Sequence, residues 1–272
     1  MHGLGNDFAI IDARETVVEL KSDFIRVLSN RNFGIGFDQL AVIYKTDNNI
    51  VAAHLKFWNS DGSPSATCGN ATRCIARMLM EELKIDSINL STDFTILESR
   101  RDNFGNIAVN MGIPLFGWSD IPLAYECDTS NLPIEGNPIA TNIGNPHCTF
   151  LVENIDDYSI SQFGQKYENH ELFPERTNVQ IAQIVNKSEI RVKVWERGAG
   201  ITMSSGSSSC AVTVAASRRG LIGEKSRIIL DGGELEVFWG KDGVWMSGET
   251  AHVYDGTISN ELFSNWKNYE KN

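Results

Sequence analysis

Residues 57–83 read FWNSDGSPSATCGNATRCIARMLMEEL, and their pattern predicts the central elements of the first half of the chain. Its first residues end a β-rich segment, and a loop of small and polar residues follows. From Gly69 onward the apolar side chains recur at helical spacing, so we predict a helix over residues 69–83. The residues that define this spacing are Ile75, Met78, Leu79 and Leu83. The stretch therefore predicts a strand, a short loop and a helix in direct succession.

A second stretch, residues 194–219, repeats this order of parts half a chain later as VWERGAGITMSSGSSSCAVTVAASRR. A strand ends near its start, a loop of small residues follows, and we predict a helix over residues 206–219. Each predicted helix begins at a glycine, Gly69 in the first stretch and Gly206 in the second. The pattern indicates an internal duplication, in which strands wrap one central helix in each half. Coincidence between two loops rich in glycine and serine is the alternative explanation.

Most of the remaining chain reads as short strands with alternating apolar positions, which is typical of a mixed α/β (α+β) protein. We expect strands over residues 9–12, 41–44, 51–57, 95–99, 107–110, 147–152, 179–184, 189–195, 227–230, 235–239 and 244–246. Shorter helices are expected near residues 22–28, 159–167 and 260–267. The first domain would span residues 1–115 and the second residues 116–253, with residues 254–272 packing back on the first domain.

The composition is that of an ordinary globular protein, with 42% hydrophobic and 22% charged residues. The net charge is −11 and the isoelectric point is near 4.9, which opposes binding to nucleic acids or to anionic membrane surfaces. The amino end has no basic stretch leading into an apolar one, and the longest uncharged run, residues 198–217, is too polar to span a bilayer. The five cysteines are an odd number, which favours free thiols in a reducing cytoplasm. We therefore expect a cytoplasmic protein that binds a small molecule.

Cys68 immediately precedes the first predicted helix, where unpaired backbone N–H groups and the positive end of the helix dipole stabilise an anion. A thiolate at this position could act as a base or as a nucleophile near neutral pH. A buried structural cysteine is the alternative, and we assign Cys74 and Cys210 to that role. If both helix starts point into one cleft, their N–H groups could bind a carboxylate between them.

Two further positions could carry chemistry. His147 follows an Asn-Pro turn and opens a strand, from which a side chain can reach a cleft. Glu196 and Arg197 stand where a strand gives way to a glycine-rich loop, and a solvated ion pair is the alternative there.

The six-residue step from Cys68 to Cys74 matches no common zinc spacing, so we expect no metal. The Gly-x-Gly steps of the chain lack the strand-then-helix setting of a dinucleotide site, so we expect no bound dinucleotide either.

Six blocks in chain order carry a resemblance to a known family. They read MHGLGNDF (residues 1–8), GIGFDQL (34–40), NSDGS (59–63), CGNATRC (68–74), GNPHC (144–148) and ERGAG (196–200). Together they resemble the diaminopimelate epimerases, and the match extends from the amino end to residues 230–233, nearly the whole chain. The resemblance implies interconversion of LL- and meso-diaminopimelate for lysine and peptidoglycan synthesis, without pyridoxal phosphate or metal. It also implies a homodimer of two-domain subunits, with the active site between two pseudo-symmetric halves whose barrel-like sheets surround a central helix.

The resemblance further implies a two-base mechanism, in which one thiolate removes the Cα proton and a thiol on the opposite face returns one. Cys68 matches the first cysteine and Ser205 takes the place of the second, while His147 and Glu196 match positions thought to tune the two thiols. The positions that match substrate contacts are Asn6, Gln39, Asn59, Gly69, Asn70, Asn145, Asn178, Glu196, Arg197, Gly206 and Ser207. Among these, Asn59, Asn178 and Arg197 would hold the distal amino-acid end of the substrate.

Ser205 is the departure with the largest chemical consequence. Where the family block reads ACGTGAC, residues 204–210 of this chain read SSGSSSC. Three explanations fit: an engineered change in an active parent, which we favour here, a natural variant, or a binding protein that has lost catalysis. Related proline-racemase-like enzymes with a Cys/Ser or Cys/Thr pair epimerise or dehydrate hydroxyprolines. A racemase, epimerase or dehydratase of another amino acid and a silent amino-acid binder therefore stay open as alternatives.

An alcohol is a far weaker acid than a thiol, so Ser205 should be a poor second base. We predict that the chain inverts diaminopimelate slowly or not at all, while Cys68 still exchanges the Cα proton on its own face. Deuterium uptake from heavy water, followed beside the change in stereochemistry, measures both rates. Inversion as fast as exchange would contradict this prediction.

Overall fold

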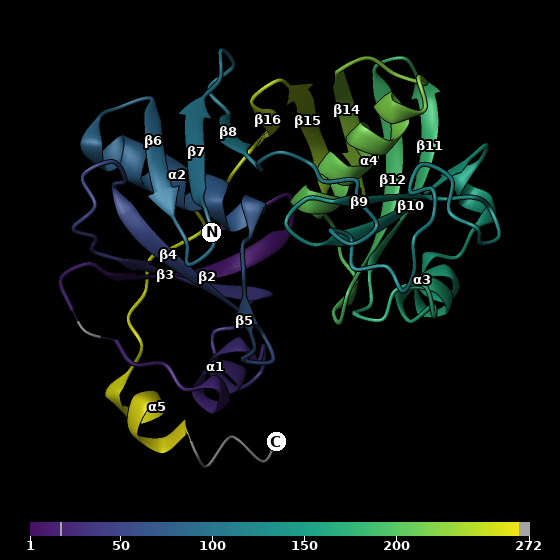
Figure 1. Cartoon of the computed structure of the whole chain (residues 1–272). Helices are drawn as coiled ribbons and strands as arrows, with labels where there is room; N and C mark the ends of the chain where they lie inside the picture. The colour runs from purple at the N-terminus through teal and green to yellow at the C-terminus, as the bar shows by residue number, and fades with distance from the viewer. Residues whose placement is uncertain (17, 267–272) are drawn as a thin grey trace. The chain divides into compact units, whose positions relative to one another are not determined.

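The computed structural model describes residues 1–16 and 18–266 of the chain. They form two compact units, the first made of Met1–Ile107 and the chain from Thr250 onward, the second of Ala108–Glu249. The divisions lie a few residues before those expected from the sequence. The backbone N–H of Met111 donates to Val244 O and that of Val244 to Gly112 O, which ties the segment after Ile107 to the second unit. Each unit combines a strand-rich sheet with few helices, which confirms the mixed α/β prediction (Figure 1).

The first unit has a sheet with the strand order β1-β2-β3-β4-β6-β7 and with β5 beside β4. The pairs β2–β3 and β4–β6 are parallel, and the other neighbours in this order are antiparallel. Its elements are β1 (His2–Gly3), β2 (Asn6–Ala13), α1 (Ser22–Ser29), β3 (Gln39–Tyr44), β4 (Ala53–Asn59), β5 (Pro64–Ser65), α2 (Gly69–Leu83), β6 (Ser87–Ser91), β7 (Ile96–Arg101) and α5 (Asn260–Asn265).

Helix α2 has the predicted bounds and is the central helix of the first unit. It contacts β1, β2, β6 and β7, and it ends at Lys84, whose left-handed backbone breaks the helix. The predicted apolar stripe is wrong at its end, because Leu83 is 48% exposed and Met80 is buried. Ile75, Leu79 and Met80 therefore lie on the buried face of α2, and Leu83 lies outside it.

Helix α5 returns the end of the described chain to α1, as Figure 1 shows. The ring of Phe24 on α1 lies 5.2 Å from that of Phe263, edge to face, and 5.8 Å from that of Trp266. Aromatic pairs at these distances add to the burial of apolar surface. The helix expected over residues 260–267 is present over Asn260–Asn265, and residue 267 lies outside the described residues.

The second unit has a sheet with the strand order β8-β16-β15-β14-β12-β11-β10-β9, in which β10–β11 and β12–β14 are parallel. Its elements are β8 (Ile107–Asn110), β9 (Ile139–Asn142), β10 (Pro146–Val152), η1 (Ile155–Asp157), α3 (Ile160–Glu168), β11 (Asn178–Asn186), β12 (Glu189–Glu196), β13 (Gly200–Ile201), α4 (Gly206–Arg218), β14 (Lys225–Leu230), β15 (Gly233–Gly240) and β16 (Gly243–Gly248). Five strands were not expected from the sequence: β1, β5 and β13, which have two residues each, and β6 and β9, which have few apolar residues.

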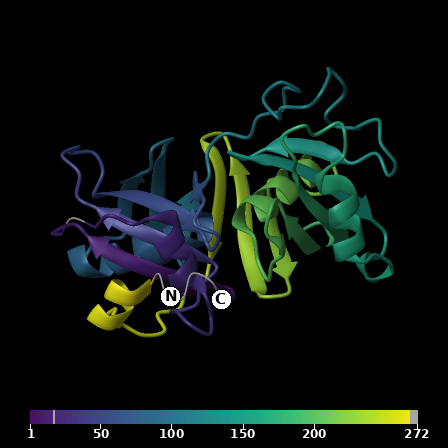
Figure 2. The same ribbon diagram turned by 90° about the horizontal axis from the view of Figure 1, so that it is seen from below.

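Helix α4 is the central helix of the second unit, and the sheet curves around it (Figures 1 and 2). It contacts the strands β9, β10, β11, β12, β14, β15 and β16. A second helix of the unit, α3, also packs against β11 and β12. Small side chains such as Ala211 and Ala215 let the strands approach α4 closely, and both are fully buried. Polar side chains in the first turns of α4 are consequently withdrawn from water together with the apolar ones.

No helix in the part of the chain that the structure describes has both the length and the apolar character needed to cross a bilayer.

Candidate functional site

Cys68 caps the amino-terminal end of α2, as the sequence predicts. Its backbone is extended, and its Sγ accepts a hydrogen bond from the backbone N–H of Ala71 at 3.4 Å. The carbonyl oxygen of Cys68 accepts from both the N–H and the hydroxyl of Thr72, each at 2.8 Å. The thiol is half-buried. A sulfur held against the N–H groups of a helix start is favoured as the thiolate, because the helix dipole and the donated hydrogen bond both stabilise negative charge.

Asn70, the second residue of α2, is joined to the start of β2 by a chain of side chains. Its Nδ2 donates to Asn6 Oδ1 at 3.2 Å, and its Oδ1 accepts from the buried guanidinium of Arg73 at 2.8 Å. Asn6 Nδ2 in turn donates to Asp38 Oδ2 at 2.9 Å. Two of the predicted substrate contacts, Asn6 and Asn70, are thereby brought together beside Gly69 and Cys68.

Gln39 and Asn59 lie directly opposite each other on β3 and β4. Gln39 Nε2 donates to Asn59 Oδ1 at 2.9 Å, and Asn59 Nδ2 donates to Ser63 Oγ at 3.0 Å. Gln39 follows Asp38 in the chain, so the Asn6–Asp38 contact connects this pair to the α2 start. The first unit therefore gathers all six of its predicted site residues at one region of its sheet.

Ser205 stands at the start of α4 and is 3% exposed. Its hydroxyl makes no capping bond to the helix but donates to Glu196 Oε2 at 3.0 Å. Its carbonyl oxygen accepts from the N–H and the hydroxyl of Ser209. The carboxylate of Glu196 is therefore the group that receives a proton if the Ser205 hydroxyl loses one. Gly206 and Ser207, the other predicted contacts here, are the first two residues of α4.

His147 is fully buried on β10, and both of its ring nitrogens have partners. Nε2 lies 2.7 Å from Asn145 Oδ1, and Nδ1 lies 3.0 Å from Gln180 Nε2. Burial, with a smaller contribution from the positive charge of Arg197, lowers the pKa of His147 to about 3. The imidazole is therefore neutral throughout the physiological pH range.

Asn178 contacts Arg197 at the end of β12, and the contact is made to the backbone of Arg197 and not to its guanidinium. Asn178 Oδ1 accepts from the N–H of Arg197 at 3.0 Å, and its Nδ2 donates to Pro146 O at 2.9 Å. The guanidinium of Arg197 donates to Glu175 O at 3.1 Å. Asn178 thus fixes the loop that carries Arg197, and both groups of its amide are engaged in doing so.

Two buried polar residues of the second unit, Glu168 and Gln180, were not identified as candidate site residues from the sequence. Glu168 accepts from Trp195 Nε1 at 2.6 Å and from the N–H of Gly198 at 2.9 Å, so it anchors the loop after Glu196. Gln180 is fully buried, although alternation along β11 suggests an outward, solvated position. The alternation misleads because α3 and α4 cover β11, so that its polar positions are also buried.

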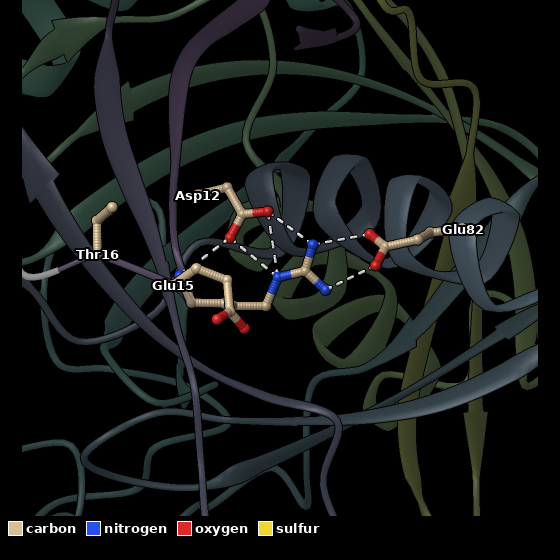
Figure 3. Close-up of a pocket in the computed structure, with 5 residues that line it drawn as sticks. Asp12, Glu15, Thr16 and Glu82 are labelled. Carbon is tan, nitrogen blue, oxygen red and sulfur yellow. Dashed lines mark hydrogen bonds and ion pairs between the residues drawn. The ribbon is translucent and has the colours of Figure 1, made fainter.

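A separate opening in the first unit is lined by Asp12, Arg14, Glu15, Thr16 and Glu82 (Figure 3). None of the predicted site residues lines it. The guanidinium of Arg14 lies 2.6 Å from an Asp12 oxygen and 2.7 Å from a Glu82 oxygen. One guanidinium thus lies among three carboxyl groups, those of Asp12, Glu15 and Glu82, so the charges of the lining residues do not cancel. Within residues 1–16 and 18–266, no three His, Cys, Asp or Glu side chains are grouped to hold a metal ion.

Comparison with known proteins gives consistent matches over nearly the whole chain. The family model for diaminopimelate epimerase matches residues 1–116 and 139–253. A diaminopimelate epimerase from Acidiphilium cryptum is 41% identical over 264 residues, covering 95% of this chain and 94% of that protein. Another from Zymomonas mobilis is 39% identical over 269 residues, covering 97% of each chain.

Solved structures of related folds match at much lower sequence identity. A probable proline racemase from Agrobacterium radiobacter has a TM-score of 0.67 at 14% identity, over 98% of this chain and 94% of that one. A hydroxyproline epimerase from Agrobacterium vitis has a TM-score of 0.64 at 13% identity, over 91% and 87%. These structures share the fold of this chain.

The buried neutral state of His147 makes the stability of the second unit depend on pH. Between the folded pKa of about 3 and the unfolded value of 6.5, the unfolded chain binds the extra proton, so acid favours unfolding. The free energy of unfolding should fall by about 2 kcal/mol from pH 7 to pH 5 because of this residue. Urea unfolding of the chain and of His147→Gln at both pH values measures the loss, which the variant should lack. The matched control, exposed His252→Gln, should keep the full pH dependence, and an equal loss in all three proteins would contradict the prediction.

Proposed function

Because the chain belongs to the diaminopimelate epimerase family, we propose that it binds diaminopimelate and transfers the proton at the reacting Cα. The observation that carries the proposal is the position of Cys68, whose sulfur accepts an N–H at the start of α2. The thiolate takes the Cα proton, and the electron pair of the C–H bond stays on the substrate. The backbone N–H groups at Gly69 and Asn70 bind the adjacent carboxylate, which disperses the developing negative charge.

On the other face of the substrate, the proposal assigns proton delivery to Ser205 and Glu196. The Ser205 hydroxyl gives its proton to Cα, and Glu196, after taking up a proton from water, returns one to the serine oxygen along the 3.0 Å contact. The reverse step needs the hydroxyl to accept a Cα proton while Glu196 takes the hydroxyl proton, which is slower than with a thiolate. We therefore propose that exchange from the Cys68 face is faster than inversion.

The distal end of the substrate is assigned to Asn59 of the first unit and to Arg197 and Asn178 of the second. The guanidinium of Arg197 can pair with a carboxylate in a bidentate manner. Asn178 supports this through its bond to the Arg197 N–H.

The serine-rich start of α4 bears on how Ser205 arose. Ser208 replaces a glycine of the family block quoted above, and its Oγ accepts from Gln180 at 3.0 Å. Ser209 replaces an alanine and donates to Ser205 O at 2.8 Å. Because several departures are built into one hydrogen-bond network, we now propose a natural serine-rich block rather than a single engineered change.

The Ser205→Cys variant tests the assignment of the second face. Restoring a thiol should raise the rate of LL to meso inversion by about 100-fold or more, the usual contribution of a well-placed proton-transfer group. A coupled epimerase assay with LL-diaminopimelate, proline, hydroxyproline and histidine measures this gain and the substrate preference together. Ser217→Cys, which adds a thiol in the last turn of α4, is the matched control and should give no gain.

The same assay separates the alternative functions. Turnover of hydroxyproline but not of diaminopimelate would identify an enzyme for another amino acid. Binding of diaminopimelate with no turnover, even after Ser205→Cys, would identify an amino-acid-binding protein and would contradict the epimerase proposal.

We also propose that the enzyme is a cytoplasmic homodimer that needs no organic cofactor. None of the five cysteines forms a disulfide, and the Cys68 thiol needs a reducing environment to remain a thiol. Analytical ultracentrifugation of the purified chain should give twice the 30.2 kDa subunit mass. A single species at the subunit mass would exclude the dimer.

A further inference from the structure

Gln180 sits at the centre of the buried polar network of the second unit, and its carboxamide is saturated. Its two N–H donors reach His147 Nδ1 and Ser208 Oγ, each at 3.0 Å. Its oxygen accepts from the Thr149 hydroxyl at 3.2 Å. The four residues of this network are all fully buried: Gln180, His147, Thr149 and Ser208. Water cannot reach their polar groups, so the protein itself must supply these hydrogen bonds.

The chemistry of the amide decides the state of the imidazole. An amide nitrogen donates hydrogen bonds and has no lone pair to accept one, so Nδ1 of His147 must present its lone pair to Gln180. The single ring proton is then on Nε2, which donates it to Asn145 Oδ1 at 2.7 Å. A proton on Nδ1 would face an N–H of Gln180 and break the network. Neither ring nitrogen is left over to exchange a proton with a substrate.

We propose that Gln180 is a positioning residue that fixes His147 as the Nε2–H tautomer and, through it, the orientation of Asn145. In this arrangement His147 holds a substrate-binding side chain in place and does not transfer a proton to or from the substrate. The bond from Gln180 to Ser208 also ties the pair to the first turn of α4, two residues beyond Gly206. The inference rests on the proposed function for its kinetic part, because Asn145 is one of the proposed substrate contacts.

In the Gln180→Glu variant the new side chain has nearly the same shape as glutamine, but the direction of its hydrogen bond to His147 Nδ1 is reversed. A carboxylate accepts and does not donate, so Nδ1 of His147 must carry a proton to keep the contact. The tautomer is read by ¹⁵N NMR of histidine-labelled protein, with His147→Gln identifying the resonance. The unchanged chain should show Nε2 protonated and Nδ1 unprotonated, and Gln180→Glu should show Nδ1 protonated. Gln183→Glu, the same change on the same strand, is the control, because its oxygen already accepts from Arg191 and Ile155 N.

Kinetics on the Ser205→Cys background supply the second measurement. Misplacing one substrate contact should raise KM for diaminopimelate about tenfold in Gln180→Glu, with a smaller change in kcat, and Gln183→Glu should leave both unchanged. A loss confined to kcat would mean that His147 takes part in proton transfer after all and would overturn the inference.

The spectrum of the unchanged chain tests the inference even if Gln180→Glu does not fold. A His147 ring that is protonated at Nδ1 in that spectrum would overturn it. The expected tautomers without any turnover of diaminopimelate would leave the network intact and instead refute the proposed function. Gln180→Leu, which removes the donor without adding a charge, should give a mixture of both tautomers, and a pure Nε2–H form there would also count against a role for Gln180.

Discussion

The structure depends on the unpaired N–H groups at the starts of two buried helices. In each unit the sheet surrounds one central helix, so the first turn of that helix is largely withdrawn from water. N–H groups in that setting need an acceptor, and the positive end of the helix dipole favours one that is negatively charged. At α2 the acceptor is the sulfur of Cys68. The same constraint that must be met for folding therefore creates a place where a thiolate and a bound carboxylate are both stabilised.

The start of α4 meets this constraint differently. The Ser205 hydroxyl turns from the helix to Glu196, and the neighbouring serines bond to the backbone and to Gln180. Serine suits this environment because each hydroxyl both donates and accepts. A thiol is a much weaker hydrogen-bonding group but a much better acid. The second unit therefore has a well-satisfied polar network at the position where the family block has an acidic thiol.

Burial decides what each polar side chain of the second unit can do. His147 is surrounded by the unit and remains neutral because the charged form would lose its hydration. Glu168 is also buried but receives donors from Trp195 and Gly198, which stabilise its interaction with the loop that carries Glu196 and Arg197. The two residues differ because the hydrogen-bond partners of His147, Asn145 and Gln180, are uncharged, whereas Glu168 also forms an ion pair with the guanidinium of Arg176 at 3.3 Å.

The mixed α/β class, the two central helices and the family are all predictable from the sequence, because helical spacing, a glycine at each helix start and short motifs are local features. It also marked Cys68, since a residue just before a helix start faces unpaired N–H groups wherever the helix lies. The hydrogen-bond partners follow from the packing of the folded chain: Glu196 for Ser205, Gln180 for His147 and the backbone N–H of Arg197 for Asn178. These contacts join strands and helices that are distant in the chain, and strand alternation places Gln180 towards solvent, whereas α3 and α4 cover β11. Register and burial on both faces of a sheet arise from packing, so no local pattern of residues could reveal them.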